Sequence, residues 1–248
     1  MLFPGSRYRL EDFIEATGHI TSRERLYEYF RETMLSCGFD RVNFSIRHDD
    51  DVPEEERRFG IISSCPEDWQ KHYAEAGYAG IDPVYRCAIS TFHPFRWKTL
   101  EKVLDLSAAQ TRFLRLGEEA GLNNGIGIPF AGARNQIAGV ALATSNRRAD
   151  HLSNLDLLSA YSNQFYATYK RLVRAQHPAP PCMVVLSPRE QEVLKWIAAG
   201  KSDNDIAGIL TVSSHTVAYH LRNVFLKLRV NNRVTAVVVA ITQGLIEI

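Results

Sequence analysis

The chain has 248 residues, of which 45% are hydrophobic and 23% are charged, and its formal net charge is +1. This length suits one large domain, or a medium domain and a small one. Because it has no window of about eighteen apolar residues and no signal-peptide core near the N-terminus, the sequence excludes a membrane-spanning or exported protein. We therefore expect a cytoplasmic protein.

Cysteine usage argues against a disulfide-bonded fold. Cys37, Cys65, Cys87 and Cys182 include no CxxC pair and are too sparse for a disulfide framework. Free thiols are favoured over a metal or redox site.

The first elements change from helical to strand periodicity. A short helix is predicted over Leu10–Thr17 and a longer one over Ser22–Cys37, with Gly38 as its terminator. Residues 41–47 then alternate between apolar and polar, which is typical of a strand with one buried face. The apolar set is Val42, Phe44 and Ile46, and the polar set is Arg41, Asn43, Ser45 and Arg47.

Two acidic runs, Asp49–Asp51 and Glu54–Glu56, precede a second predicted strand over Phe59–Ser64. Because the acids lack a regular ligand spacing, a solvated loop is favoured over a metal site.

The next region alternates between helices and strands. Helices are predicted over Pro66–Glu75, from Asp82 and Pro83 onward, over Ser107–Ala120 and over Asn154–Arg174. Strands are predicted over Phe92–Trp97, Gly125–Phe130 and Ile137–Thr144, the last two joined by the polar turn Gly132–Asn135. This order predicts the α+β class, with an α–β–α sandwich around a mainly antiparallel sheet.

Three prolines within residues 176–181, QHPAPP, mark a domain boundary. We place a first domain at residues 1–174, a linker at 175–186 and a second domain at 187–248. A capping box, Ser187-Pro188-Arg189-Glu190, opens the second domain. Four helices are predicted in this domain: one to about Ala199, one over Asp203–Leu210, one from Ser213 or Ser214, and one over Arg233–Gln243. Together they predict a four-helix helix-turn-helix domain.

The third of these helices has a basic surface. Residues 213–233 hold four basic side chains and no acidic one. Apolar side chains recur at helical spacing on the other face: Val217, Leu221, Val224 and Leu228. The pattern favours a nucleic-acid surface, and a protein-docking module is the alternative that it leaves open.

The second domain closely resembles the DNA-binding domain of LuxR-type regulators over the run LSPREQEVLKWIAAGKSDNDIAGILTVSSHTVAYHLRNVFLKL. The matching positions are Glu190, Leu194, Gly200, Ile206, Ala207, Val217, His220 and Leu228. The resemblance implies that the third helix enters the major groove of double-stranded DNA.

The same resemblance implies particular DNA contacts. Arg222 matches a base-reading position, where its planar fork suits guanine, and Ala218 offers a methyl contact to thymine. The other candidates are Ser214, His215, Thr216, Tyr219 and Asn223 for base or phosphate, and Lys201 and Lys227 for phosphate. A solvated helix face is the alternative.

The first domain resembles the acyl-homoserine-lactone-binding domain of the quorum-sensing LuxR branch over CPEDWQKHYAEAGYAGIDPVYRCAISTFHPFRW. The resemblance implies that Trp69 donates its indole N–H to the lactone carbonyl and that Asp82 accepts from the amide N–H. Tyr73, Val84 and Trp97 would line the pocket. Taken singly, these residues are better explained as core or as a helix cap, but their joint spacing favours a pocket.

The chain departs from this pattern at two positions. Cys65, a weak donor, stands where many relatives carry a tyrosine. Leu142 aligns where relatives often place a hydroxyl near the amide carbonyl, with Thr144 and Ser145 nearby. A ligand with an unusual acyl group, or a water molecule in place of the tyrosine hydroxyl, would compensate for the missing hydroxyl at Cys65.

We therefore expect a homodimeric quorum-sensing transcription regulator that needs no cofactor or metal, binds an N-acyl-homoserine lactone and palindromic DNA, and works with RNA polymerase. The dimer surface is predicted on the helix Asn154–Arg174 and around Val237 and Ala240. One alternative is an orphan regulator of this architecture that senses a different small molecule. A lactone hydrolase is disfavoured because the sequence contains no G-x-S-x-G motif or HxxxH-type ligand set.

Overall fold

The computed structural model describes residues 9–91, 93–132, 136–147, 154–177 and 184–247. These residues form two compact units, which divide near residue 178. No helix among the described residues is long and apolar enough to cross a membrane.

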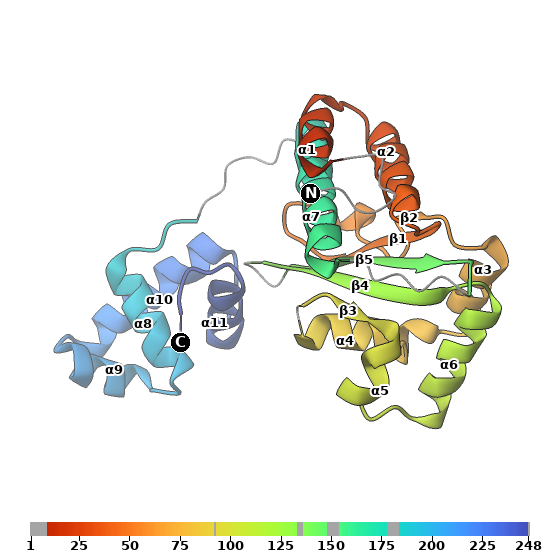
Figure 1. The fold of residues 1–248 in the computed structure, drawn as a ribbon. Coiled ribbons are helices and arrows are strands. Elements are labelled where there is room, and N and C mark those ends of the chain that lie inside the picture. Colours follow the sequence, from red (N-terminus) through yellow and green to blue (C-terminus); the bar gives the residue numbers. More distant parts are fainter. Residues whose placement is uncertain (1–8, 92, 133–135, 148–153, 178–183, 248) are drawn as a thin grey trace. The chain divides into compact units, whose positions relative to one another are not determined.

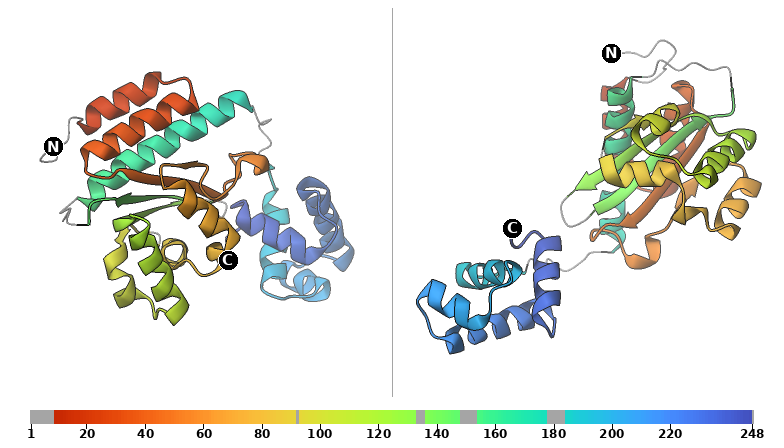
Figure 2. Two further views of the ribbon diagram at one scale, coloured as in Figure 1. Left: turned by 90° about the vertical axis from the view of Figure 1, so that its right-hand side faces the viewer. Right: turned by 90° about the horizontal axis from the view of Figure 1, so that it is seen from below.

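The first unit is a sheet between two layers of helices (Figures 1 and 2). The strands lie in the order β2-β1-β5-β4-β3. Their bounds are β1 Arg41–His48, β2 Ile62–Ser63, β3 Phe95–Arg96, β4 Asn123–Gly132 and β5 Gln136–Thr144. Strand β1 is antiparallel to β2 and β5, and β3 to β4. The predicted α+β sandwich is confirmed.

The helices divide between the two faces of this sheet. One layer contains α1 (Leu10–His19), α2 (Arg23–Ser36) and α7 (Leu155–Gln176), as Figure 1 shows. The opposite layer contains α3 (Glu67–Glu75), α4 (Pro83–Thr91), α5 (Leu100–Val103) and α6 (Ala108–Glu119). The short helix α5 has no counterpart among the predicted elements.

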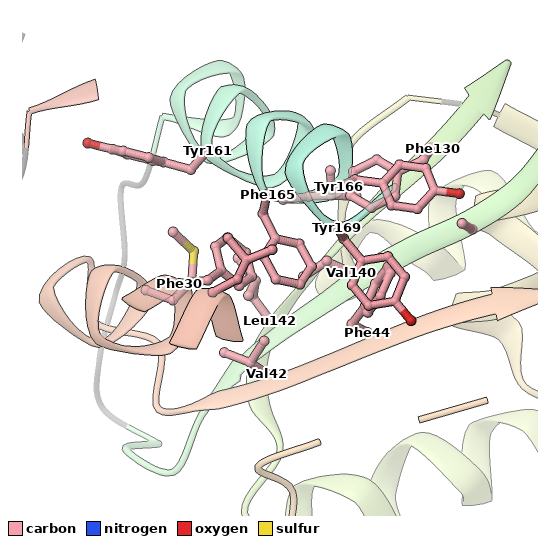
Figure 3. Packing of buried hydrophobic residues seen from close by; sticks show 14 of the residues in the cluster. Phe30, Val42, Phe44, Phe130, Val140, Leu142, Tyr161, Phe165, Tyr166 and Tyr169 are labelled. Carbon is pink, nitrogen blue, oxygen red and sulfur yellow. The ribbon is translucent and has the colours of Figure 1, made fainter. Parts of the chain in front are cut away.

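The face under α2 and α7 is a close-packed aromatic core (Figure 3). Phe165 of α7 is fully buried, stacks on Phe30 with 4.4 Å between ring centroids, and meets Phe44 edge-on at 5.1 Å. Val42, Val140 and Leu142 contribute the aliphatic side chains of β1 and β5. Such edge and stacked pairs stabilise a core beyond the apolar area that they bury.

The acidic residues after β1 interact with α7. Asp49 is buried and accepts a hydrogen bond from the Tyr166 hydroxyl. The Lys170 ammonium lies 3.4 Å from Asp49 and 3.3 Å from Asp51. The prediction of a solvated loop is wrong for Asp49, because the Lys170 ammonium and the Tyr166 hydroxyl of α7 replace water around its carboxylate.

The second predicted strand is shorter than expected. Gly60 adopts a left-handed backbone conformation with φ of 61°, which interrupts the segment Phe59–Ser64 and leaves only Ile62–Ser63 in the sheet. The predicted strand Phe92–Trp97 is limited to Phe95–Arg96, and its first residue lies outside the described residues. The predicted turn Gly132–Asn135 also falls largely outside them.

The second unit contains α8 (Pro188–Ala198), α9 (Asp203–Leu210), α10 (Ser214–Leu228) and α11 (Arg233–Thr242). The predicted capping box is present: the Ser187 amide donates to Glu190 at 2.7 Å, and the Glu190 amide donates to the Ser187 hydroxyl at 3.3 Å. Ser213 caps α10 by accepting from the Thr216 amide at 3.1 Å. The four-helix helix-turn-helix domain is confirmed.

Candidate functional site

A cavity of about 1000 Å³ lies between the sheet and the layer of α3, α4 and α6. Its sheet wall on β4 and β5 includes a group of small residues: Gly125, Gly127, Gly139, Ala141 and Ala143. A Cβ atom on Gly125 would lie 2.0 Å from the Trp97 ring, and one on Gly127 would lie 2.3 Å from Phe95. Glycine is therefore required where these rings approach the sheet.

The polar centre of the cavity is the pair Tyr73 and Asp82. The buried Tyr73 hydroxyl donates to Asp82 Oδ2 at 3.0 Å. Asp82 Oδ1 accepts from the amides of Val84 at 2.8 Å and Tyr85 at 3.3 Å, so the same carboxylate caps α4. The helix cap and the tyrosine together hold the carboxylate in one orientation.

Burial controls the ionisation of this pair. Burial raises the pKa of Asp82 to about 6, although hydrogen bonds from Tyr73, Val84 and Tyr85 act to lower it. Burial, and then the neighbouring Asp82 charge, raise the pKa of Tyr73 above its ordinary value. A further donor reaching Asp82 would favour its ionised form.

Two indole rings, Trp69 and Trp97, line the same cavity. Trp69 contacts the rings of Tyr73, Tyr78 and Phe113, with centroid distances of 6.4, 6.3 and 5.7 Å. Trp97 lies against Gly125, and its Nε1 is buried without a hydrogen-bond partner among the described residues. A buried N–H without a partner costs about 1–3 kcal/mol, which a ligand oxygen would recover.

The cavity brings together six of the seven sequence-predicted pocket residues: Cys65, Trp69, Tyr73, Asp82, Val84 and Trp97. The placement of Leu142 is wrong. Leu142 is fully buried in the aromatic core on the opposite face (Figure 3), and its neighbours Ala141 and Ala143 line the cavity. Successive side chains of a strand point to opposite faces, so an error of one residue reverses the assignment.

The hydroxyls near Leu142 also have other partners. Thr144 is buried, and its hydroxyl accepts from the Asn146 amide at 3.2 Å. The Ser145 hydroxyl donates to Asp40 at 2.6 Å. Neither residue lines the cavity.

Several lining residues were missed by sequence reasoning. Phe59 stacks on Tyr73 with 4.4 Å between ring centroids, and Phe113 of α6 contacts Trp69. Arg41, Asn43 and Ser45, the polar face of β1, also line the cavity. Their alternation was visible in the sequence, but the helical layer that covers them was not.

The outer surface of α10 carries most of the predicted DNA contacts. Ser214, His215, Tyr219 and Arg222 are exposed, as is Lys201 before α9, and Thr216, Ala218 and Asn223 are partly exposed. Val217, Val224 and Leu228 are buried, and Leu221 is partly buried. The helix therefore presents one face to solvent and the other to its own domain.

Two of the basic residues in this region are paired inside the domain. The Lys227 ammonium lies 2.6 Å from Glu190, which is buried, and donates to the Val185 carbonyl at 3.2 Å. Arg233 lies 3.4 Å from Asp203 and donates to the Lys201 carbonyl at 2.8 Å. We therefore revise the predicted role of Lys227 from phosphate contact to a tie between α10 and α8.

Comparison with known proteins identifies both units. Residues 22–168 match the family described as autoinducer binding domain, and residues 184–240 match the bacterial regulatory proteins of the luxR family. The chain belongs to the LuxR family. This is a family of transcription regulators and not of enzymes, so the chain is a LuxR-type regulator with an autoinducer-binding domain.

Relatives match the chain over nearly its whole length. The transcriptional activator AhyR of Aeromonas hydrophila is 28% identical over 243 residues, covering 96% of this chain and 92% of that protein. The transcriptional activator SolR of Ralstonia nicotianae is 31% identical over 239 residues, covering 92% and 95%. The solved structure of SdiA in complex with octanoyl-rac-glycerol shares the fold, with a TM-score of 0.64 at 20% identity and coverage of 95% and 94%.

Proposed function

We propose that this LuxR-family regulator binds an N-acyl-homoserine lactone in a first domain, residues 1–174, and palindromic promoter DNA through a second, residues 187–248. Residues 175–186 link the two domains. The regulator acts in the cytoplasm as a homodimer, with no cofactor beyond its ligand, and contacts RNA polymerase. Relatives named transcriptional activators over the full length support this proposal.

The observation that carries the ligand proposal is the oriented, buried carboxylate of Asp82 in a cavity that two indole rings also line. An acyl-homoserine lactone offers one amide N–H donor, two carbonyl acceptors and a hydrocarbon chain. Asp82 suits the donor, and the indole N–H groups of Trp69 and Trp97 suit the carbonyls. Each buried pair made in this way avoids the cost of an unsatisfied polar group.

Asp82→Asn tests this assignment. Asparagine keeps the cap on α4 but replaces one acceptor oxygen by an NH₂ group that repels the ligand N–H. We expect the thermal midpoint to be retained and the affinity for octanoyl-homoserine lactone, measured by tryptophan fluorescence, to fall about 5–150-fold, the equivalent of about 1–3 kcal/mol. Asp68→Asn, on the exposed side of α3, is the matched control. Equal affinities in the two variants would contradict the proposal.

The DNA proposal places α10 in the major groove, with Arg222 reading a guanine. One four-helix unit covers one half-site, so a palindrome requires two copies. The expected contact residues Val237 and Ala240 are partly and fully buried within their own domain. We therefore move the proposed dimer surface on α11 to the exposed Val234, Val238 and Ile241.

Selecting bound sequences from a random DNA pool would supply the operator for a gel-shift test. Arg222→Ala should relax the preference for guanine at one position of each half-site and weaken binding by about 1–3 kcal/mol. Arg229→Ala, a second exposed arginine near the end of α10, serves as the control and should leave base preference unchanged. Unaltered specificity in Arg222→Ala would count against the assigned helix.

A second candidate is a regulator of the same architecture that senses a different acyl compound. Cys65 lacks the donor strength of a tyrosine at the cavity wall, and SdiA, a structural neighbour, is solved with octanoyl-rac-glycerol. Mass spectrometry of organic extracts from protein purified out of lactone-fed cells separates the two. A recovered lactone supports the first candidate, and a recovered acyl compound without the lactone ring supports the second.

A further inference from the structure

One wall of the cavity, on β1, carries polar side chains, whereas the adjacent strand β5 contributes small apolar ones. Arg41, Asn43 and Ser45 point from β1 into the cavity, and Ser63 of β2 pairs with Asn43 in the sheet register. We call these four residues the β1 wall. On the same face, β5 contributes Gly139, Ala141 and Ala143. Because the β5 side chains are short, a ligand crossing this face has open access to the β1 wall.

The β1 wall retains unused hydrogen-bond donors. The Arg41 Nε is buried and has no hydrogen-bond partner among the described residues. The Ser45 hydroxyl accepts from Asn43 Nδ2 at 3.2 Å and from the Gly60 amide at 2.9 Å, so its own proton is left to donate. A ligand that reaches this wall therefore meets groups that require an acceptor.

The charge around this wall is positive. Between residues 41 and 65, the residues that line the cavity include the cations Arg41, Arg47, Arg57 and Arg58 and no carboxylate. The acidic lining residues lie in the helical layer instead: Asp82, Glu101 and Glu118. Arg41 is partly offset by Asp40, whose carboxylate lies 3.5 Å away and also binds Ser145. The cavity thus has an accepting carboxylate in its helical layer and a donating, cationic wall on the sheet.

We propose that the physiological ligand carries a carboxylate on the part of its acyl group that meets the β1 wall. This inference rests on the proposed function, which places the ligand amide at Asp82. A plain hydrocarbon against the β1 wall would remove water from Arg41 and Asn43 and replace none of its hydrogen bonds. A carboxylate matches the planar donor fork of arginine.

The test compares ligands of equal chain length by calorimetric titration into the full chain. The probes are octanoyl-homoserine lactone and the same lactone with a terminal carboxylate on its acyl chain. The wild type should bind the carboxylated lactone at least about tenfold more tightly, the advantage of a charge-assisted pair. Arg41→Met and Asn43→Leu should each reduce this preference severalfold, because each removes donors that favour the carboxylate over the plain chain. Arg86→Met, exposed on α4 and outside the cavity lining, is the control and should keep the wild-type preference.

A third probe, the carboxylated acyl amide without the lactone ring, separates this inference from the proposed function. Wild-type preference for the plain lactone, or an unchanged preference in Arg41→Met, overturns the inference and leaves the lactone proposal standing. Binding of the ring-free amide together with failure of both lactones overturns the lactone proposal and supports the role of the β1 wall. Failure of all three probes overturns both.

Discussion

The two faces of the central sheet are built from the same strands, but one packs against an aromatic core and the other borders a cavity. Toward α2 and α7, the strands present Val42, Phe44, Val140 and Leu142 to a continuous aromatic core (Figure 3). Toward α3, α4 and α6, they present glycine, alanine and polar side chains to a cavity. One face is close-packed and contributes to stability. The other borders a cavity, which we propose as the ligand site.

The largest expected effect comes from deleting a ring on the packed face. Phe165→Ala should lower the free energy of unfolding by about 3–5 kcal/mol, since the ring is fully buried against Phe30 and Phe44. Urea denaturation of the full chain measures the loss. Phe59→Ala removes the same ring from the cavity side, where Phe59 is half exposed, and should cost much less. Similar losses would show that the two faces contribute equally to stability.

Substitutions at two neighbouring residues of β5 also distinguish the two faces of the sheet. Leu142→Ala should destabilise the domain by about 2–5 kcal/mol and leave ligand affinity unchanged in the folded fraction. Ala141→Leu places a larger side chain in the cavity and should weaken ligand binding with little loss of stability. Denaturation and titration on both variants give the result, and a reversal of the two phenotypes would show that the assignment of faces is wrong.

A third change tests the Trp97 ring that lines the cavity. Gly125→Ala places a Cβ atom where the Trp97 indole lies, so the ring must move, and ligand affinity should fall by about tenfold, or about 1.4 kcal/mol. Gly117→Ala is the matched control, because its Cβ would meet Trp69 at an ordinary 3.7 Å. Equal affinities in the two variants would remove Trp97 from the binding site.

The smallest expected effect is a pH dependence. Burial raises the pKa of Asp82 to about 6, and a ligand N–H donated to the carboxylate would lower it again, so binding releases a proton. Affinity should be constant above about pH 6 and should weaken about tenfold per unit below it. The same raised pKa means that the stability of the ligand-free domain falls as pH rises from about 4 to about 6, because the unfolded chain ionises Asp82 in this range while the folded domain keeps it protonated. Fluorescence titrations between pH 5 and pH 8, with Asp82→Asn as a flat reference, measure the dependence.

Short-range patterns in the sequence predicted several structural features of this protein. The capping box Ser187–Glu190 and the α10 stripe depend on residues three or four apart, and both are present as predicted. The family resemblance also predicted that Trp69, Tyr73 and Asp82 share one cavity, and all three line it.

What the sequence did not reveal depends on partners far along the chain. Lys227 binds Glu190 across the domain, and Asp49 binds Tyr166 and Lys170 of α7. Alternation showed that β1 has two faces, but only the position of the α3–α6 layer shows that Arg41 and Asn43 face a cavity and not solvent. The misplacement of Leu142 has a different origin, because an alignment error of one residue assigns a strand side chain to the opposite face.

Native mass spectrometry of the purified full chain with octanoyl-homoserine lactone, its carboxylated analogue and the Asp82→Asn variant tests the central claim most directly. The account predicts one lactone per wild-type chain, with the carboxylated form retained in competition, and reduced retention by Asp82→Asn. A wild-type chain that retains neither lactone, or a variant that retains them equally well, would contradict the claim that the face opposite α7 is the ligand site.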